Sequence, residues 1–140
     1  MKIMIPVDGS EYTQKAVNFY LDHKQSLGKY GSVTLLHVSA PLPRLVSAAL
    51  SKQLAENHYA DEVSEAMSWA RTRFAQYEVT CAEKVEIGEA ATAICALAEQ
   101  EKFDLIIIGS RGRGSVPGLA IGSTALKVLT GCKVPVLIVR

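Results

Sequence analysis

The alternation of two kinds of segment constrains the fold of this chain most. Five short apolar runs alternate strictly with four longer segments in which apolar residues recur at three- and four-residue steps. Such an alternation predicts a parallel sheet with right-handed crossover connections. The apolar runs are residues 2–7, 32–38, 79–87, 104–109 and 134–139, and the helical segments are residues 11–28, 45–77, 89–101 and 123–130.

Differences among the apolar runs predict the order of the strands. Residues 2–7 and 104–109 are the most continuously apolar, which is typical of parallel strands buried on both faces, so we expect them to be central neighbours. Residues 79–87 alternate apolar with polar side chains, which indicates an edge of the sheet. The order 3-2-1-4-5 satisfies both conditions. The chain is therefore predicted to be one α/β domain over residues 1–140, with four helices covering a five-stranded parallel sheet.

This strand order also predicts where a ligand binds. Strands 2 and 3 lie on one side of the first strand, whereas strands 4 and 5 lie on the other, so the order of the strands reverses between the first and the fourth. Ligands of such sheets bind beside this switch point, at the carboxyl ends of the strands. Two loops meet there: Asp8-Gly9-Ser10 after the first strand, and residues 109–122 after the fourth. Residues 41–53 fit no clear pattern, and we expect their first part to form a mobile lid.

The second of these loops has the composition of a phosphate site. Its glycines leave backbone amides uncovered, and Ser123 and Thr124 follow at the start of a helix, where free N–H groups and the dipole favour an anion. Its spacing differs from two common phosphate loops. Ser115 and Val116 stand where a Walker A loop needs Lys and a hydroxyl, and Pro117 interrupts the dinucleotide fingerprint.

The spacing that remains is that of a known signature. Gly109 and Gly112 are separated by two residues, and after nine more residues come Gly122 and Ser123. This pattern resembles, without a gap or a substitution, the ATP-binding signature of the universal stress protein family. The Val-Asp-Gly-Ser sequence at residues 7–10 and the Pro-Val-Leu-Ile-Val sequence near the C-terminus resemble the same family. The resemblance therefore covers essentially the whole chain.

The resemblance implies a Rossmann-like fold of the adenine nucleotide α-hydrolase type, with ATP as ligand and Mg²⁺ beside it. It also implies the strand order 3-2-1-4-5. Members of the family read the adenine with the backbone at the position of Val38. Motifs and resemblance together give the candidate nucleotide-binding residues Pro6, Val7, Asp8, Val38, Ile108, Gly109, Arg111, Gly112, Gly122, Ser123 and Thr124.

The charged residues of the two loops have expected roles. Ser10 is better placed than Asp8 to cap the first helix, so we expect Asp8 to contact the ribose or to coordinate Mg²⁺ through water. Arg111 and Arg113 lie within the phosphate loop, and we expect at least one of them to contact the anion. His37 has no Ser or Cys partner beside it in the sequence, so we expect it to be a hydrogen-bonded strand residue rather than a catalyst.

Candidate catalytic residues are few. A kinase or nucleotidase needs a positioned base and groups that stabilise charge at the γ-phosphate, and Asp8 is the only acid in the two site loops. This scarcity favours a nucleotide-binding module over an enzyme, and the resemblance implies a regulatory role in a stress response. Three alternatives stay open: a slow Mg²⁺-dependent ATPase, a protein that phosphorylates itself with bound ATP, and a binder of AMP or cyclic AMP.

Composition narrows the range of partners. Residues 105–140 carry five cations and no acid, so the glycine-rich part attracts anions, but this charge is too small and too localised to predict nucleic-acid binding. The first apolar run is too short for a signal peptide or a membrane span, so we expect a cytoplasmic protein without membrane contact. Cys81, Cys95 and Cys132 are widely separated, and we expect reduced thiols with no redox role at Cys132.

The last strand predicts an assembly. It is an edge by its position, yet it is nearly as apolar as the central strands, whereas edges are normally blunted by charge, bulges or brevity. The simplest cover is a second copy of the chain, with the two last strands antiparallel across a two-fold axis. We expect a homodimer with Val136, Leu137 and Ile138 at the interface, and the resemblance implies the same contact.

Overall fold

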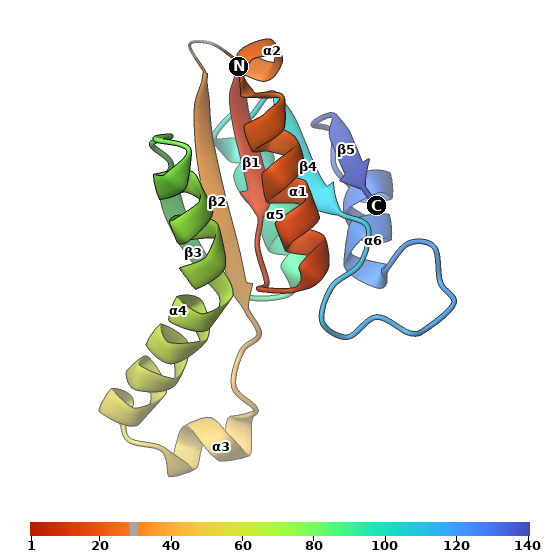
Figure 1. Cartoon of the computed structure of the whole chain (residues 1–140). Helices are drawn as coiled ribbons and strands as arrows, with labels where there is room; N and C mark the ends of the chain where they lie inside the picture. The colour runs from red at the N-terminus through yellow and green to blue at the C-terminus, as the bar shows by residue number, and fades with distance from the viewer. Residues whose placement is uncertain (29–30) are drawn as a thin grey trace.

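The computed structural model describes residues 1–28 and 31–140 and contains a five-stranded parallel sheet (Figure 1). The strand order is β3-β2-β1-β4-β5, as predicted. The strands are β1 (Lys2–Pro6), β2 (Ser32–Ser39), β3 (Ala82–Ile87), β4 (Leu105–Gly109) and β5 (Val136–Val139). The helices in the described part of the chain are α1 (Glu11–Asp22), α2 (Lys24–Gly28), α3 (Arg44–Ala49), α4 (Lys52–Gln76), α5 (Ala90–Gln100) and α6 (Ser123–Gly131).

The helices form a layer on each face of the sheet, with α1 and α4 on one face and α5 and α6 on the other (Figure 1). Strand β1 shows why the core has two halves. Ile3 and Ile5 belong to the cluster under α1 and α4, whereas Met4 belongs to the cluster under α5 and α6. Successive side chains of a strand point to opposite faces, so the continuous apolar run of β1 matches a strand that is covered by helices on both faces.

The four long helices form the predicted layers, and two short helices, α2 and α3, were not predicted. The first helical segment is interrupted after Asp22, where the His23 ring Nδ1 lies 2.8 Å from the carbonyl oxygen of Phe19 in the last turn. The second segment is interrupted before Ser51, whose hydroxyl accepts a hydrogen bond from the N–H of Leu54 at 3.2 Å and starts α4 anew. Side-chain hydrogen bonds thus end one helix and begin the next, although the helical spacing of apolar residues continues across each break.

Strand β3 lies at the sheet edge, as predicted, but begins later than predicted. Residues 79–81 follow the turn at the end of α4 as irregular chain, and the strand starts at Ala82. Its apolar side chains are less covered than the alternation suggested, because Val85 is 45% exposed and Ile87 is 55% exposed. Glu83 makes a two-pronged ion pair with Arg71 of α4, at 2.6 and 2.8 Å. The alternating pattern therefore located the edge correctly but overstated the burial of the inward face.

The segment expected to form a lid consists of a loop, α3 and the start of α4, and it extends beyond the carboxyl ends of the strands (Figure 1). Helix α3 has no buried residue, and Leu45 is 88% exposed. A cavity lies at the carboxyl ends of β1 and β4, and residues 41–61, all of which are described, do not line it. A lid over the site therefore gains no support from this arrangement. Within the described ranges, no helix combines the length and apolarity needed to cross a membrane.

Candidate functional site

A cavity of about 560 Å³ lies at the carboxyl ends of β1 and β4, where the strand order reverses. This volume is typical of a site for a small molecule or cofactor. The structure places all the predicted nucleotide-binding residues around this one cavity, and their contacts with a nucleotide stay a prediction. They are Pro6, Val7, Asp8, Val38, Ile108, Gly109, Arg111, Gly112, Gly122, Ser123 and Thr124.

The lining of the cavity is both apolar and polar. Val38 and Ile108, at the ends of β2 and β4, contribute apolar surface, together with Ile94 of α5. Ser123 and Thr124 form the first turn of α6, whose N-cap is Gly122. The first N–H groups of a helix have no partner within the helix and point along its axis, so this part of the cavity favours an anion. A ligand with an apolar ring and an anionic group fits both kinds of lining.

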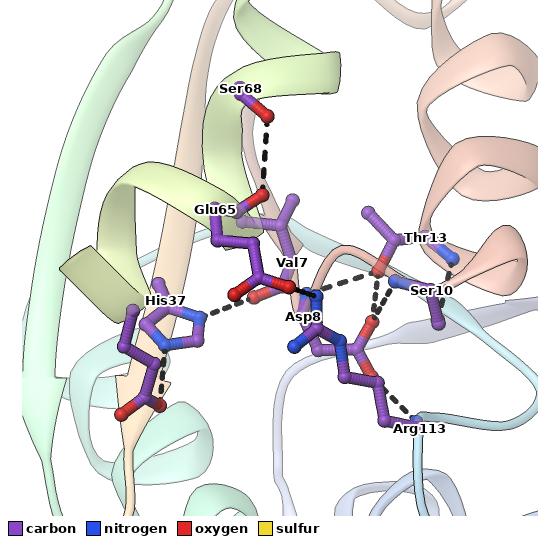
Figure 2. A network of polar contacts seen from close by, with 9 residues as sticks. Val7, Asp8, Ser10, Thr13, His37, Glu65, Ser68 and Arg113 are labelled. Carbon is purple, nitrogen blue, oxygen red and sulfur yellow. Dashed lines mark hydrogen bonds and ion pairs between the residues drawn. The ribbon is translucent and has the colours of Figure 1, made fainter.

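Asp8 is held by hydrogen bonds from both site loops (Figure 2). Its Oδ1 accepts from the N–H of Ser10 at 2.9 Å and from the hydroxyl of Thr13 at 2.7 Å, while Oδ2 accepts from the N–H of Arg113 at 3.2 Å. Burial works to raise the pKa of Asp8, but these hydrogen bonds outweigh it, and the pKa lies below its ordinary value. Ser10 caps α1 by accepting from the N–H of Thr13, as predicted. Asp8 is thus an ionised tie between the two loops.

Contacts within the protein explain three glycines of the signature. A Cβ atom on Gly112 would lie 2.7 Å from Oδ2 of Asp8, and a Cβ atom on Gly122 would lie 3.2 Å from the Cα of Arg111. A Cβ atom on Gly109 would lie 2.6 Å from the carbonyl oxygen of Tyr12, so α1 packs directly on the end of β4. The glycines therefore let the two site loops and α1 approach one another closely, in addition to leaving amides uncovered.

The two arginines of the glycine-rich loop line the cavity and also contact α1 and α4, the helices on the other face of the sheet from α6. Arg111 donates from Nη1 to the Tyr12 hydroxyl on α1 at 3.2 Å. Arg113 donates from Nη2 to Oε1 of Glu65 on α4 at 3.1 Å (Figure 2). The Arg113 guanidinium lies over Gly9, where an added Cβ atom would be 2.7 Å from Nη2 and where φ is +78°. Both side chains thus connect the loop to this layer, Arg111 by a hydrogen bond to α1 and Arg113 by an ion pair with α4.

A histidine–glutamate pair in the cavity wall was missed as part of the site. His37 is hydrogen bonded, as predicted, with Nδ1 2.8 Å from the carbonyl oxygen of Val7 (Figure 2). Its Nε2 lies 3.2 Å from Oε1 of Glu62, and both residues line the cavity. His37 is only 5% exposed. No local motif marks Glu62, because its place in the site depends on where α4 crosses the end of β2.

Comparison with known proteins identifies the family and agrees with the fold. The model of the universal stress protein family matches residues 1–140. The chain belongs to the universal stress protein family. It is 31% identical to universal stress protein G of Shigella flexneri over 99% of this chain and 97% of that protein. It is 30% identical to a universal stress protein of Thermus aquaticus, again over 99% and 97% of the two chains.

Solved structures share the fold of this universal stress protein. UspA from Lactobacillus plantarum superposes with a TM-score of 0.81 at 24% identity, over 100% of this chain and 97% of that chain. The resemblance that rested on the glycine spacing is therefore confirmed at the level of family and fold.

Proposed function

We propose that this universal stress protein binds an adenine nucleotide, ATP together with Mg²⁺, and acts as a regulatory module of a stress response. One observation carries the proposal: two loops far apart in the sequence meet at one cavity that joins apolar strand ends to a helix N-terminus. In this proposal the adenine lies against Val38 and Ile108, and the backbone of Val38 reads its edge. The phosphates lie against Gly112, Gly122 and the first turn of α6.

The side chains present fit a magnesium ion that is shared with the nucleotide. Mg²⁺ is usually held by one or two carboxylates together with substrate phosphates and water, and Asp8 is the ionised carboxylate of the site loops. Among the described residues its Oδ2 accepts one hydrogen bond, from the N–H of Arg113 at 3.2 Å, which leaves a lone pair that can accept from a bound water. Among the described residues, no three His, Cys, Asp or Glu side chains gather as a metal cluster. The ion would neutralise phosphate charge.

Two solved relatives support an adenine nucleotide as the ligand class. One is a universal stress protein in complex with cAMP, with a TM-score of 0.72 at 20% identity. The other is an Arabidopsis thaliana protein of the family with AMP bound, with a TM-score of 0.67 at 17% identity. These relatives hold a monophosphate and a cyclic monophosphate, so the proposal of ATP for this chain rests on the glycine spacing. Measuring the binding of ATP, AMP and cyclic AMP side by side tests that choice.

Thermal unfolding with each nucleotide tests the proposal. A ligand that binds only the native state at about a hundredfold over its Kd adds about 2.7 kcal/mol to the free energy of unfolding. For a domain of this size, the melting midpoint should rise by several degrees. We expect the largest rise with ATP and Mg²⁺, smaller rises with AMP and cyclic AMP, and the same order of Kd values by calorimetry. Saturating ATP that gives neither a shift nor heat would refute the proposal.

A second measurement separates binding from catalysis. Single-turnover incubation with labelled ATP, followed by quantification of ADP and of protein-bound phosphate, distinguishes a regulatory module from a slow ATPase or a protein that phosphorylates itself. We expect ATP to be recovered largely intact, because Asp8 is the only acid of the two site loops and already serves as the tie between them. Stoichiometric ADP or phosphoprotein would favour the enzymatic alternatives.

We further propose a homodimer formed through β5. Every residue of β5 is only partly buried, although the strand is entirely apolar. Helix α6 contacts β5 and leaves Leu126 49% exposed and Leu129 44% exposed. The opposite edge, β3, carries Glu83, Lys84 and Glu86, and such charges oppose pairing with another strand. The apolar edge is thus the one that a second copy would cover.

A further inference from the structure

Glu62 is a second carboxylate of the nucleotide cavity, and it has no part in the proposed magnesium site. Among the described residues that line the cavity, Asp8 and Glu62 are the only acids. The Oδ1 atom of Asp8 already accepts two hydrogen bonds, and its Oδ2 atom accepts from the N–H of Arg113 and faces the proposed ion. A ligand hydroxyl that needs a carboxylate acceptor in this cavity therefore finds one at Glu62.

The buried ring of His37 holds one oxygen of Glu62 in place. Nδ1 of His37 lies 2.8 Å from the carbonyl oxygen of Val7 (Figure 2), and because a carbonyl oxygen only accepts, this nitrogen carries a hydrogen. Nε2 lies 3.2 Å from Oε1 of Glu62, and a hydrogen bond there requires a second proton between the two atoms. The pair as a whole then has no net charge. Glu62 can thus face the cavity without repelling the phosphates of a ligand.

The other oxygen of Glu62 is available to a ligand. In the described part of the chain, the contact of Oε2 is with Nε2 of His58 at 3.8 Å, which is too long for a hydrogen bond. The side chain of Glu62 is 32% exposed, so it is reached from the cavity but is not free in solvent. The carboxyl group is therefore oriented through one oxygen and able to accept a hydrogen bond through the other.

The place of Glu62 in the cavity matches the sugar of a bound nucleotide. In the proposed pose the base lies at the ends of β2 and β4 and the phosphates lie at the start of α6, so the ribose crosses the end of β1. His37, the partner of Glu62, precedes Val38 in β2 and contacts the carbonyl of Val7, the residue after β1. In dinucleotide-binding sheets an acidic residue likewise accepts a hydrogen bond from a ribose hydroxyl.

We propose that Glu62, positioned by His37, accepts a hydrogen bond from a ribose hydroxyl and thereby selects ribonucleotides over deoxyribonucleotides. The inference rests on the proposed function and adds recognition of the sugar to it. A site that hydrogen bonds a substrate hydroxyl disfavours the analogue that lacks it, because the acceptor loses its partner. Glu62 is partly exposed, so water replaces part of the lost interaction, and a preference of about tenfold is expected.

Calorimetric titration of the full chain with Mg²⁺ and either ATP, 2′-deoxy-ATP or 3′-deoxy-ATP tests the proposal. At least one of the two deoxynucleotides should bind the parent about tenfold more weakly than ATP. Glu62→Ala should weaken ATP by about the same factor and leave the Kd of that deoxynucleotide within about twofold, so that the preference disappears. Asp61→Ala is the matched control, because Asp61 is the exposed neighbour on α4 that does not line the cavity, and it should keep the preference.

A variant of His37 tests its positioning role. His37→Phe keeps a ring in the same place but removes both ring nitrogens. The preference for ATP over the deoxynucleotide should decrease, because Glu62 is no longer held. A purely structural defect would weaken both nucleotides by the same factor and leave the ratio of their Kd values unchanged, which would refute the positioning role. Glu62→Ala lies at a partly exposed position and tests the sugar contact independently of this variant.

The remaining outcomes separate this inference from the proposed function. Equal Kd values of the parent for ATP and both deoxynucleotides would overturn the inference and leave the proposed function intact. A preference that persists in Glu62→Ala would show that another group reads the hydroxyl. If Glu62→Ala instead changes the preference for ATP over inosine triphosphate and leaves the deoxynucleotide ratio unchanged, Glu62 reads the base, and the inference is wrong. A parent that binds none of these nucleotides would refute the inference and the proposed function together.

Discussion

The Asp8 carboxylate is bound from three directions, so its charge matters for the stability of the fold as well as for a ligand. The hydrogen bonds from Ser10, Thr13 and Arg113 outweigh burial and hold its pKa below the ordinary value. A carboxylate with a lower pKa in the folded than in the unfolded state stabilises the fold at pH values above the unfolded pKa, which is about 3.9. That stabilisation is lost as the pH falls through the folded pKa.

Replacing Asp8 with Asn tests this linkage. Asp8→Asn should lower the free energy of unfolding by about 1–3 kcal/mol at pH 7, because hydrogen bonds to a charged acceptor are replaced by weaker ones. The difference from the parent should stay constant down to about pH 4 and shrink below it, as the parent carboxylate takes up its proton. Urea unfolding at a series of pH values measures this. Asp61→Asn, at an exposed position of α4, is the control and should change little. A difference that persists unchanged to the lowest pH would contradict the assignment.

Gly112 and Gly114 form a matched pair in the same loop. A Cβ atom on Gly112 would lie 2.7 Å from Oδ2 of Asp8, whereas one on Gly114 would meet nothing within 4 Å. Gly112→Ala should therefore displace the loop from Asp8 and weaken ATP binding by about tenfold, which corresponds to about 1.4 kcal/mol. Gly114→Ala should leave the Kd within about twofold of the parent. Calorimetric titration of both variants decides, and equal Kd values for the two would show that the loop tolerates the displacement.

The candidate site was predictable at some residues and not at others, for a physical reason. The glycines and the first turn of α6 are encoded by a local spacing, because an uncovered amide needs a particular residue at a particular position. The tie from Asp8 to Arg113 joins residues 105 positions apart, and it could not be read from either loop alone. The same holds for Glu62, whose contact with His37 depends on the path of a long helix.

At the scale of elements, the start of α1 after Ser10 and both ends of α6 were predicted, whereas the two breaks inside the long helical segments were missed. Helix α6 begins after Gly122 and ends at Gly131, close to its predicted bounds. The break at His23 was missed because the contact of its ring nitrogen with a backbone carbonyl does not change the helical spacing of the apolar residues. The break at Ser51 was missed in the same way, since Ser is common both at caps and on exposed helix faces.

The two ends of α6 provide the next prediction. Gly122→Val adds a branched side chain where even a Cβ atom would lie 3.2 Å from the Cα of Arg111 and 3.5 Å from the carbonyl oxygen of Ser110. The loop backbone must move away from the helix N-terminus, so ATP binding should be lost while the far-ultraviolet circular dichroism of the fold remains. Gly131→Ala, at the open far end of the same helix, should keep the parental Kd. Parental ATP binding by Gly122→Val would show that the phosphate site lies elsewhere.

For the molecule as a whole, the order of the sheet followed from how the apolar residues are distributed among the strands. Met4 and Ile106, on neighbouring strands, are fully buried in the same cluster, as expected of a shared centre. The two edges differ in a way that the sequence also indicated. β3 carries three charged residues among six, whereas β5 carries none. Burial on the inner face of β3 was overestimated, because the pattern shows alternation but not how far α4 reaches across the edge.

The open edge of β5 gives the last prediction, which concerns the dimer. The carbonyl oxygens of Pro135 and Val139 accept hydrogen bonds from β4 and the residue that follows it, so by the alternation of the ladder the N–H of Leu137 also faces β4 and the N–H of Ile138 faces the open edge. Ile138→Pro removes this outward donor and so disrupts pairing at the proposed seam between two copies, whereas Ile138→Lys places a charge on the apolar face of the strand. Light scattering at micromolar concentration should give a dimer for the parent and a monomer or an aggregate for Ile138→Pro. Leu45→Lys is the control, because Leu45 is 88% exposed on α3, far from β5 in the sequence and the fold (Figure 1), and it should remain dimeric. A parent chain that stays monomeric at high concentration would refute the dimer, and the apolar β5 edge would then need a cover from another protein.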